Sequence, residues 1–169
     1  MRILSEFFTR DVLDVAPELI GQKLIRRFSD SGISEFTITE LEIYRGEEDL
    51  ACHVSKGRTA RTEIMYGSGG FLYMYLIYGM HWMLNIVTGE REQPQAILIR
   101  GINGFDGPGK LSKHLHLNKT FNAENLSLSK RMWIESDAVI HPYTEAPRIG
   151  IDYAGEPWKS VPWRYSLGE

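Results

Sequence analysis

Apolar residues in this chain occur in short runs separated by polar segments, a pattern typical of a strand-rich protein. The most prominent run, residues 71–87, is rich in aromatic and β-branched side chains, and residues 78–80 within it are a turn candidate. A membrane-spanning helix needs about 20 mostly apolar residues, whereas this run is shorter and is interrupted by Gly79, His81 and Asn85. The pattern therefore predicts a β-hairpin.

The tyrosines of this hairpin differ in parity. Tyr73 and Tyr75 are two residues apart, so both side chains are expected on one face of the first strand. Tyr78 has the opposite parity and lies beside the turn. Apolar stripes most often belong to a core, so a purely structural role for the tyrosines stays open.

The amino-terminal third predicts a helix followed by a second hairpin. A short helix is expected over residues 16–20, capped by Thr9 or Asp14, with Pro17 in its first turn and Gly21 at its end. The hairpin strands are expected at 22–28 and 33–44, joined by a turn at 29–32, and a long polar loop with a short helical piece is expected at 45–70.

The remaining pattern predicts one more buried strand, a helix and several short strands. The buried strand, 95–102, is interrupted by the single charge of Arg100, and the helix begins at 107–110, with Leu111 and Leu115 on one face. Short strands are expected at 132–134, 138–140 and 148–153.

Composition limits the fold class. With 169 residues, 43% of them hydrophobic, and no linker-like stretch, the chain is expected to form a single domain over residues 1–169. We predict an α+β fold with a curved, mainly antiparallel sheet, flanking helices and a protruding hairpin. The single cysteine, Cys52, excludes an internal disulfide. His114 and His116 diverge on a helix, so no metal site is expected.

Charge and the amino terminus narrow the function only partly. The first residues lack a secretory signal, so an intracellular protein is expected. The net charge of −3 does not favour a nucleic-acid binder. Basic residues nevertheless gather at 53–61 and 100–119, either as a solvated surface or as a surface that follows phosphates; the candidates for backbone contact are Lys56, Arg58, Arg61 and Lys110.

Three sets of polar residues stand out among apolar neighbours. Glu40, Glu42 and Tyr44 share one strand face beside the long loop, where a carboxylate can serve as a general base. Arg100 requires an anion or water, which Glu40 or Glu42 would supply, either as a structural bridge or in a catalytic arrangement. Asn85 is the third; buried amides usually satisfy backbone groups.

Together these residues resemble the alkyladenine (3-methyladenine) DNA glycosylase family. The matching blocks keep their order from about residue 7 to 165: Glu42-Ile43-Tyr44, ACHVSKGRTAR with His53, Met65-Tyr66-Gly67, LYMYLIYGMHWMLN, ILIRG, GPGKL and PRIGIDYAGE. The resemblance implies hydrolytic excision of alkylated or deaminated purines, such as 3-methyladenine, hypoxanthine and ethenoadenine, from duplex DNA. It also implies base flipping, with no cofactor, metal or membrane.

The resemblance assigns a role to each matching position. Glu42 would activate the water and Arg100 would help to hold it. The substrate-binding residues would be Tyr44, His53, Tyr75, Asn85 and Leu98, with Tyr44 on one face of the flipped base, His53 and Tyr75 on the other, and Asn85 opposing the 2-amino group of guanine. Tyr78 would enter the duplex with Met80 beside it. Tyr73 is assigned to packing.

Further expectations follow from the same resemblance. No lysine matches a catalytic position, so a monofunctional enzyme without strand cleavage is expected, acting as a monomer on double-stranded DNA that contains a damaged purine. It would work in the bacterial cytoplasm or nucleoid, or in a nucleus.

Two rival functions remain on residues alone. One is a module that binds damaged or distorted duplex nucleic acid without chemistry; its motivation is the presence of modest basic clusters in a chain of negative net charge. The other is a carbohydrate hydrolase that uses Glu40 and Glu42, although nothing in the sequence supplies a sugar-binding cleft.

Overall fold

The long strand β2 (Gly32–Arg45) organises the sheet of the computed structural model, which describes residues 1–29 and 32–169. Its first half pairs with β1 (Lys23–Phe28) and its second half with β5 (Gln95–Ile102), both antiparallel. The strand order β3-β4-β5-β2-β1-β7 forms the main path of a nine-stranded sheet within the described residues. The other strands are β3 (Leu72–Ile77), β4 (His81–Thr88), β6 (Phe105–Asp106), β7 (Met132–Glu135), β8 (Tyr143–Ala146) and β9 (Arg164–Leu167).

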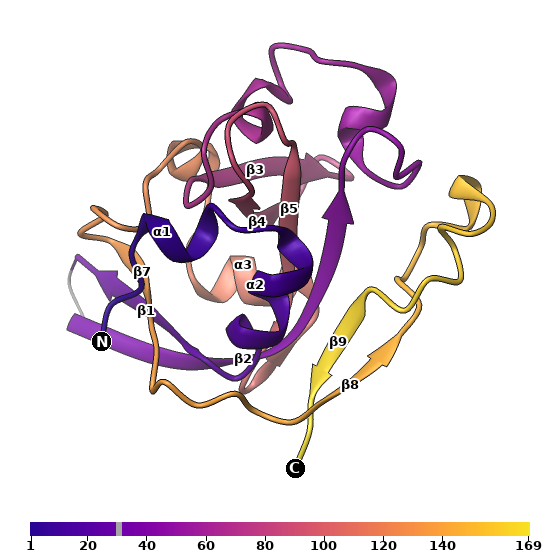
Figure 1. Ribbon diagram of the computed structural model, residues 1–169. Coiled ribbons are helices and arrows are strands. Elements are labelled where there is room, and N and C mark those ends of the chain that lie inside the picture. The colour runs from indigo at the N-terminus through magenta and orange to yellow at the C-terminus, as the bar shows by residue number, and fades with distance from the viewer. Residues whose placement is uncertain (30–31) are drawn as a thin grey trace.

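Side chains of alternate parity give the sheet two different faces. Leu41 and Ile43 of β2, Ile97 and Ile99 of β5, and Leu84 of β4 are fully buried in the main core. The helices α1 (Ser5–Phe8), α2 (Val12–Leu19) and α3 (Pro108–His114) contribute to the same core. In Figure 1 the sheet curves around α2 and α3. The predicted α+β class with a curved antiparallel sheet is confirmed.

The amino-terminal helix is longer than its pattern predicts, and its cap is a different residue. α2 begins at Val12, and the Asp11 side chain accepts a hydrogen bond from the Leu13 amide (2.9 Å), so neither Thr9 nor Asp14 is the cap. Pro17 consequently lies inside the helix rather than in its first turn, whereas Gly21 follows the end as expected, with φ of +86°.

Two expected strands are wrong, and three real ones, β6, β8 and β9, were not expected. Residues 138–140 and 148–153 do not form strands; the second segment contains a short 3-10 helix, Asp152–Ala154. β8 and β9 pair with each other instead, and β9 also pairs with β2 opposite 40–42. The expected turn at 29–32 lies partly outside the described residues, while the strands on either side of it are confirmed.

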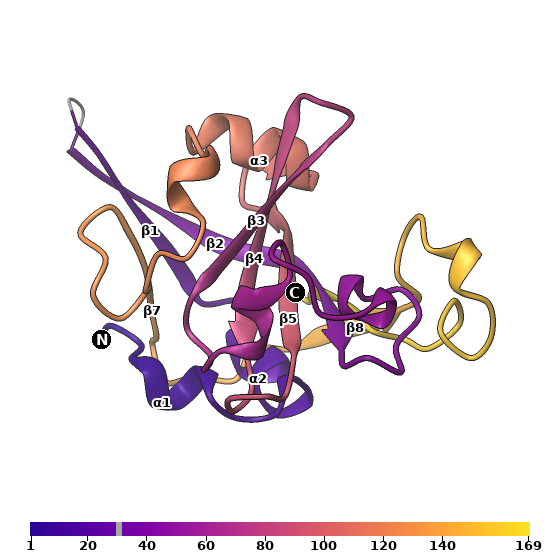
Figure 2. The same cartoon turned by 90° about the horizontal axis from the view of Figure 1, so that it is seen from above.

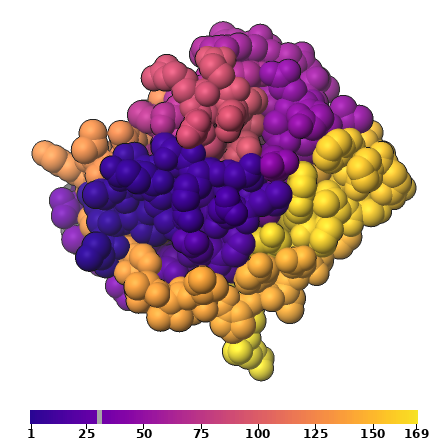
Figure 3. Space-filling view, in the orientation of Figure 1, coloured from indigo at the N-terminus to yellow at the C-terminus, as the bar shows by residue number. Residues whose placement is uncertain are grey.

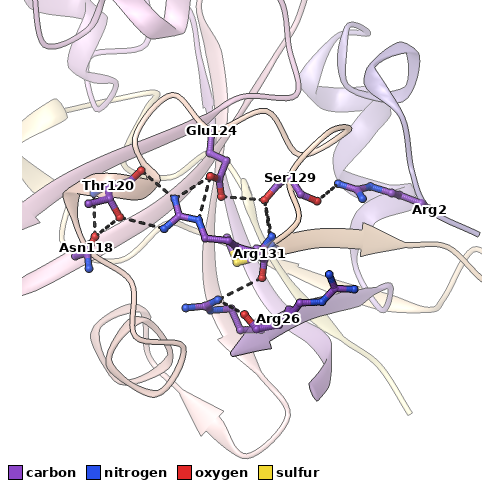
Figure 4. Close-up of polar contacts among 9 residues, drawn as sticks. Arg2, Arg26, Asn118, Thr120, Glu124, Ser129 and Arg131 are labelled. Atoms are coloured by element: carbon purple, nitrogen blue, oxygen red, sulfur yellow. Dashed lines mark hydrogen bonds and ion pairs between the residues drawn. The ribbon is translucent and has the colours of Figure 1, made fainter. Parts of the chain in front are cut away.

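The tyrosine-rich hairpin β3–β4 protrudes from the body of the molecule (Figure 2). Its outer edge is covered near the base, because Leu72 exchanges backbone hydrogen bonds with Ala123 and Glu124 (2.8 and 2.9 Å). Arg131 holds this covering segment by donating from Nη2 to Glu124 (2.8 Å) and to the Thr120 carbonyl (3.1 Å), as Figure 4 shows. The base of the hairpin is therefore fixed and its tip is free of such contacts within the described residues.

Candidate active site

The candidate site lies on the sheet face opposite the main core. Antiparallel register places Tyr73, Asn85, Leu98 and Glu42 directly opposite one another across β3, β4, β5 and β2. Since opposing residues share a face, these four side chains form one row. Tyr44 belongs to the adjoining row, opposite Ala96. Parity predicted the shared face within each strand, and the register brings these faces to one side of the sheet.

Two irregular segments cover this face and leave a cavity of about 730 Å³. One is the loop after β2, which contains the 3-10 helices His53–Lys56 and Glu63–Tyr66; the expected helical piece in this loop is thus present twice. The other is the segment 147–158 near the carboxyl end, which lies against the loop in Figure 3. The cavity is lined by the predicted residues Glu42, Tyr44, His53, Arg61, Tyr75, Tyr78, Asn85, Leu98, Arg100 and Lys110.

Glu42 is a fully buried carboxylate whose two oxygens both accept hydrogen bonds. The Tyr44 hydroxyl donates to Oε1 (2.8 Å), and the Ile149 amide donates to Oε2 (2.7 Å). Burial raises the pKa of Glu42 above its ordinary value, and the opposing influences of Arg100, the Ile149 amide and Tyr44 do not fully cancel that rise. The result is a carboxylate of raised basicity beside a cavity, as a general base requires.

Arg100 contacts both glutamates that the sequence offered as partners. Its Nε donates to Glu40 (3.0 Å), and its Nη1 lies 3.7 Å from Glu42 Oε1. The two carboxylates therefore share one guanidinium, and the closer bond goes to Glu40.

A buried ion pair behind Tyr44 was not predicted from the sequence. Arg148 donates to both oxygens of Asp49 (2.7 and 2.9 Å), and both side chains are fully buried. The guanidinium carbon lies 4.9 Å from the centre of the Tyr44 ring. The pair joins the two covering segments and fixes the segment whose Ile149 amide holds Glu42. The one sequence signal for this ion pair was the charge of Arg148 within the otherwise apolar stretch PRIGI, residues 147–151.

His53, Tyr73 and Tyr75 form an aromatic cluster on the other side of the cavity. The His53 ring lies edge-on to Tyr75, with centroids 4.5 Å apart, and its Nδ1 is 2.8 Å from the Tyr73 hydroxyl. Burial, with help from Arg61 and Lys56, lowers the pKa of His53 to about 4, so the imidazole is neutral at pH 7. Tyr73 is buried, as its assignment to packing predicts, but it also lines the cavity and its hydroxyl is hydrogen-bonded to His53.

Asn85 forms the floor of the cavity together with Leu98. Its side-chain nitrogen donates to the carbonyls of Tyr73 (3.2 Å) and Met83 (3.4 Å), so the amide satisfies backbone groups as buried amides usually do. Those bonds also fix its orientation beneath the cavity.

The hairpin tip carries exposed apolar side chains beside the mouth of the cavity. Tyr78 is 89% exposed and Met80 is 68% exposed.

The four basic residues predicted to contact the DNA backbone differ in their surroundings. Arg58 is bound by Glu63 and Glu92 (2.6 Å each), and the Arg61 guanidinium lies 5.4 Å from the Tyr75 ring centre. Lys56 and Lys110 are exposed and form no ion pair among the described residues.

Residues 1–29 and 32–169 contain no cluster of three potential metal ligands. His114 stacks on Phe105 and His116 lies edge-on to Phe28, so each is occupied by an aromatic neighbour. None of the helices described is long and apolar enough to cross a membrane.

An aromatic cavity with a buried carboxylate of raised pKa, next to a protruding aromatic hairpin (Figure 2), suits an enzyme that removes a base from DNA. Comparison with known proteins places the chain in that class, the DNA glycosylases of DNA repair. The chain matches the family model of methylpurine-DNA glycosylase over residues 6–106 and 103–169, and it belongs to this family.

Several relatives cover nearly the whole chain and are named "putative 3-methyladenine DNA glycosylase". The protein from Psychrobacter cryohalolentis is 40% identical over 91% of this chain and 86% of its own length. That from Methanocella arvoryzae is 37% identical over 95% and 89%, and that from Rickettsia felis 40% identical over 95% and 89%. The family predicted from the sequence motifs is confirmed.

Proposed function

We propose that the protein flips a damaged purine out of duplex DNA and hydrolyses its N-glycosidic bond, starting base excision repair. The observation that carries this proposal is Glu42, a fully buried carboxylate of raised pKa that lines the cavity. The substrates are alkylated or deaminated purines of the 3-methyladenine, hypoxanthine and ethenoadenine type. The enzyme is monofunctional and acts as a monomer.

Glu42 is the general base in this proposal. Departure of the purine leaves positive, oxocarbenium-like charge on the sugar, which a nearby carboxylate stabilises while it takes a proton from the attacking water. Arg100 helps to hold both the carboxylate and the water. The Tyr44 hydroxyl and the Ile149 amide keep the carboxylate fixed, so little reorganisation is needed during the reaction.

The cavity walls hold the flipped base between aromatic rings. Tyr44 stacks on one face, and Tyr75 and His53 contact the other; stacking of a base on an aromatic ring contributes about 1–3 kcal/mol. The neutral imidazole of His53 avoids repelling a cationic alkylated purine. Asn85 and Leu98 limit the size of the base at the floor, and Asn85 opposes an exocyclic 2-amino group.

The hairpin tip replaces the flipped nucleotide in the duplex. Extrusion costs a few kcal/mol of stacking and pairing, least for a damaged or mismatched base. Tyr78, with Met80 beside it, enters the vacated space and offsets part of that cost. In this proposal Lys56, Arg61 and Lys110 contact the DNA backbone.

A single-turnover assay of Glu42→Gln tests this function. Wild-type protein should release the damaged base from at least one duplex in a panel containing 3-methyladenine, hypoxanthine or ethenoadenine, leaving sites that alkali cleaves. Glu42→Gln should be slower by about 100-fold or more, and Glu90→Gln, which changes an exposed carboxylate, should match the wild type. Release by Glu42→Gln at the wild-type rate would refute the base assignment. Absence of abasic sites across the whole panel would favour a non-catalytic binder of distorted duplexes.

A further inference from the structure

Glu40 is a partly buried carboxylate beside the candidate base to which the proposed function gives no role. It shares a strand face with Glu42 and lies between two arginines from different strands. Arg100 of β5 donates from Nε to its Oε1 (3.0 Å), and Arg164 Nη1 of β9 lies 3.7 Å from the same oxygen. The β2–β5 register shifts on both sides of Glu40, which places Arg100 opposite the irregularity.

This local irregularity in β2 requires close packing of the backbone. A Cβ atom on Gly101, the residue opposite Glu40, would lie 2.8 Å from Thr39 Oγ1 and 3.2 Å from Glu40 Cβ. Bulges of this kind redirect side chains, and they are common beside active sites. The glycine therefore allows the approach that brings Glu40 onto Arg100.

Through Arg164, Glu40 is also connected to the chain segment whose Ile149 amide binds Glu42. Arg164 Nε donates to the Pro147 carbonyl (2.9 Å), two residues before the Ile149 amide that binds Glu42 Oε2. One carboxylate thus contacts the guanidinium of Arg100 on one side and, on the other, the arginine that anchors the 147–149 segment.

We propose that Glu40 is a positioning residue for Glu42, holding Arg100 and Arg164 in place and, by drawing Arg100 toward itself, keeping Glu42 a stronger base. This inference rests on the proposed role of Glu42. Its physical basis has two parts. Arg100 stabilises the charge of Glu42 less when it also binds Glu40, and the negative charge of Glu40 itself opposes ionisation of Glu42.

The other groups that face Glu42 come from each surrounding element. They are Tyr44 on β2, Tyr75 on β3, Arg100 on β5, Arg148 and Tyr153 in the segment 147–158, and Arg164 on β9. Replacing Glu40 by glutamine leaves all of these groups in place and removes one negative charge. The glutamine oxygen can still accept from Arg100 Nε, so the change separates charge from position.

The test follows single-turnover release from a lesion duplex across pH in Glu40→Gln and Glu40→Ala. Glutamine should move the acid limb of the profile to lower pH by at least about half a pH unit, with less than about a 10-fold loss on the plateau. Alanine should lower the plateau about 10-fold further, because Arg100 and Arg164 lose their common acceptor. Glu145→Gln, which removes an exposed carboxylate from β8, should match the wild type.

The outcomes against this proposal are specific. An unmoved acid limb in Glu40→Gln, or one that moves to higher pH, would overturn the electrostatic role. Equal plateaus in Glu40→Gln and Glu40→Ala would overturn the positioning role. Should Glu40→Ala fail to fold, the glutamine variant alone still decides the electrostatic part.

A carboxyl NMR titration separates this inference from the proposed function. The Glu42 carboxyl signal should titrate at lower pH in Glu40→Gln than in the wild type, and an unchanged titration would contradict the inference whatever the catalytic result. Conversely, full base release by Glu42→Gln would refute the role of Glu42 in catalysis while the NMR result still measured its coupling to Glu40.

Discussion

Glu42 is a carboxyl group whose side chain has no contact with solvent. Burial is the largest influence on its pKa, which is raised above the ordinary value of 4.5. The folded protein therefore binds this proton more tightly than the unfolded chain does. The carboxyl favours folding below its ordinary pKa, and this contribution is lost as the pH rises through the raised pKa. Ionisation of Glu42 therefore lowers the stability of the folded protein, while the proposed catalysis uses the ionised form.

Glu42→Gln should consequently be more stable than the wild type at pH 7 and lose that advantage in acid. We expect a gain in the free energy of unfolding on the order of 1 kcal/mol at pH 7, which shrinks toward zero near pH 4. Urea unfolding at both pH values measures it, with Glu90→Gln as the control for removal of an exposed charge. A variant that is less stable than the wild type at pH 7 would contradict this account.

For single residues, the sequence predicted which side chains carry the chemistry better than it predicted which residues they contact. Residues two apart on a strand share a face, so parity alone predicted that Glu42 lies on the same face as Tyr44, and Tyr73 on the same face as Tyr75. That the two faces lie on one side of the sheet follows only from the strand register. The Asp49–Arg148 pair and the Ile149 amide on Glu42 join positions about 100 residues apart, with separations of 99 and 107. Local periodicity contains no information about such pairings, and the motif match assigned no role to these residues.

The β3–β4 hairpin places an unfavourable residue at its tip. Tyr78 has φ of +53° and Gly79 has φ of +67°, and the Met80 amide donates to the Ile77 carbonyl (3.1 Å). Two central residues with positive φ are typical of a type I′ turn, in which Asn-Gly is the preferred pair. For a residue other than glycine or asparagine this conformation costs roughly 1–2 kcal/mol. A bulky aromatic residue at this strained position accords with the proposed insertion of Tyr78 into the duplex.

Tyr78→Asn should therefore stabilise the protein and weaken DNA binding. The left-handed turn suits asparagine, so we expect a gain of about 0.5–1 kcal/mol in the free energy of unfolding. Loss of the inserted ring should raise the Kd for a lesion duplex about 10-fold. Thermal melting and fluorescence anisotropy measure the two effects.

The matched control is Tyr78→Phe, which keeps both the ring and the strained turn and should resemble the wild type in both assays. An asparagine variant that binds the lesion duplex with unchanged affinity would remove Tyr78 from the interface.

Element prediction succeeded where turn chemistry and apolar runs agreed. The β3–β4 hairpin, β5 and the start of α3 were placed correctly, since each has a turn or glycine signal beside a continuous apolar run. Residues 148–153 have strand-forming composition, yet Arg148 and Ile149 are used to contact Asp49 and Glu42 rather than a neighbouring strand. Long-range contacts thus overrode local propensity there.

The whole molecule has a net charge of −3 although its proposed substrate is a polyanion. Basic residues at the cavity mouth can compensate only where their charge is not already neutralised. Arg58 is bound by two glutamates, whereas Lys110 lines the cavity and forms no ion pair among the described residues. The clustering of basic residues along the sequence therefore did not show which of them are neutralised by acidic neighbours in the fold.

Lys110→Ala should change the salt dependence of DNA binding, and Arg58→Ala should not. Each phosphate contact that is lost reduces the slope of log K against log salt concentration by about 1, so titrations of an undamaged duplex at several salt concentrations distinguish the two residues. The variants carry the same net charge, which makes each the control for the other. Equal slopes in the two variants would show that overall charge, rather than the free cation at the cavity mouth, governs association. A smaller slope only in Lys110→Ala would place the DNA backbone beside the first turn of α3.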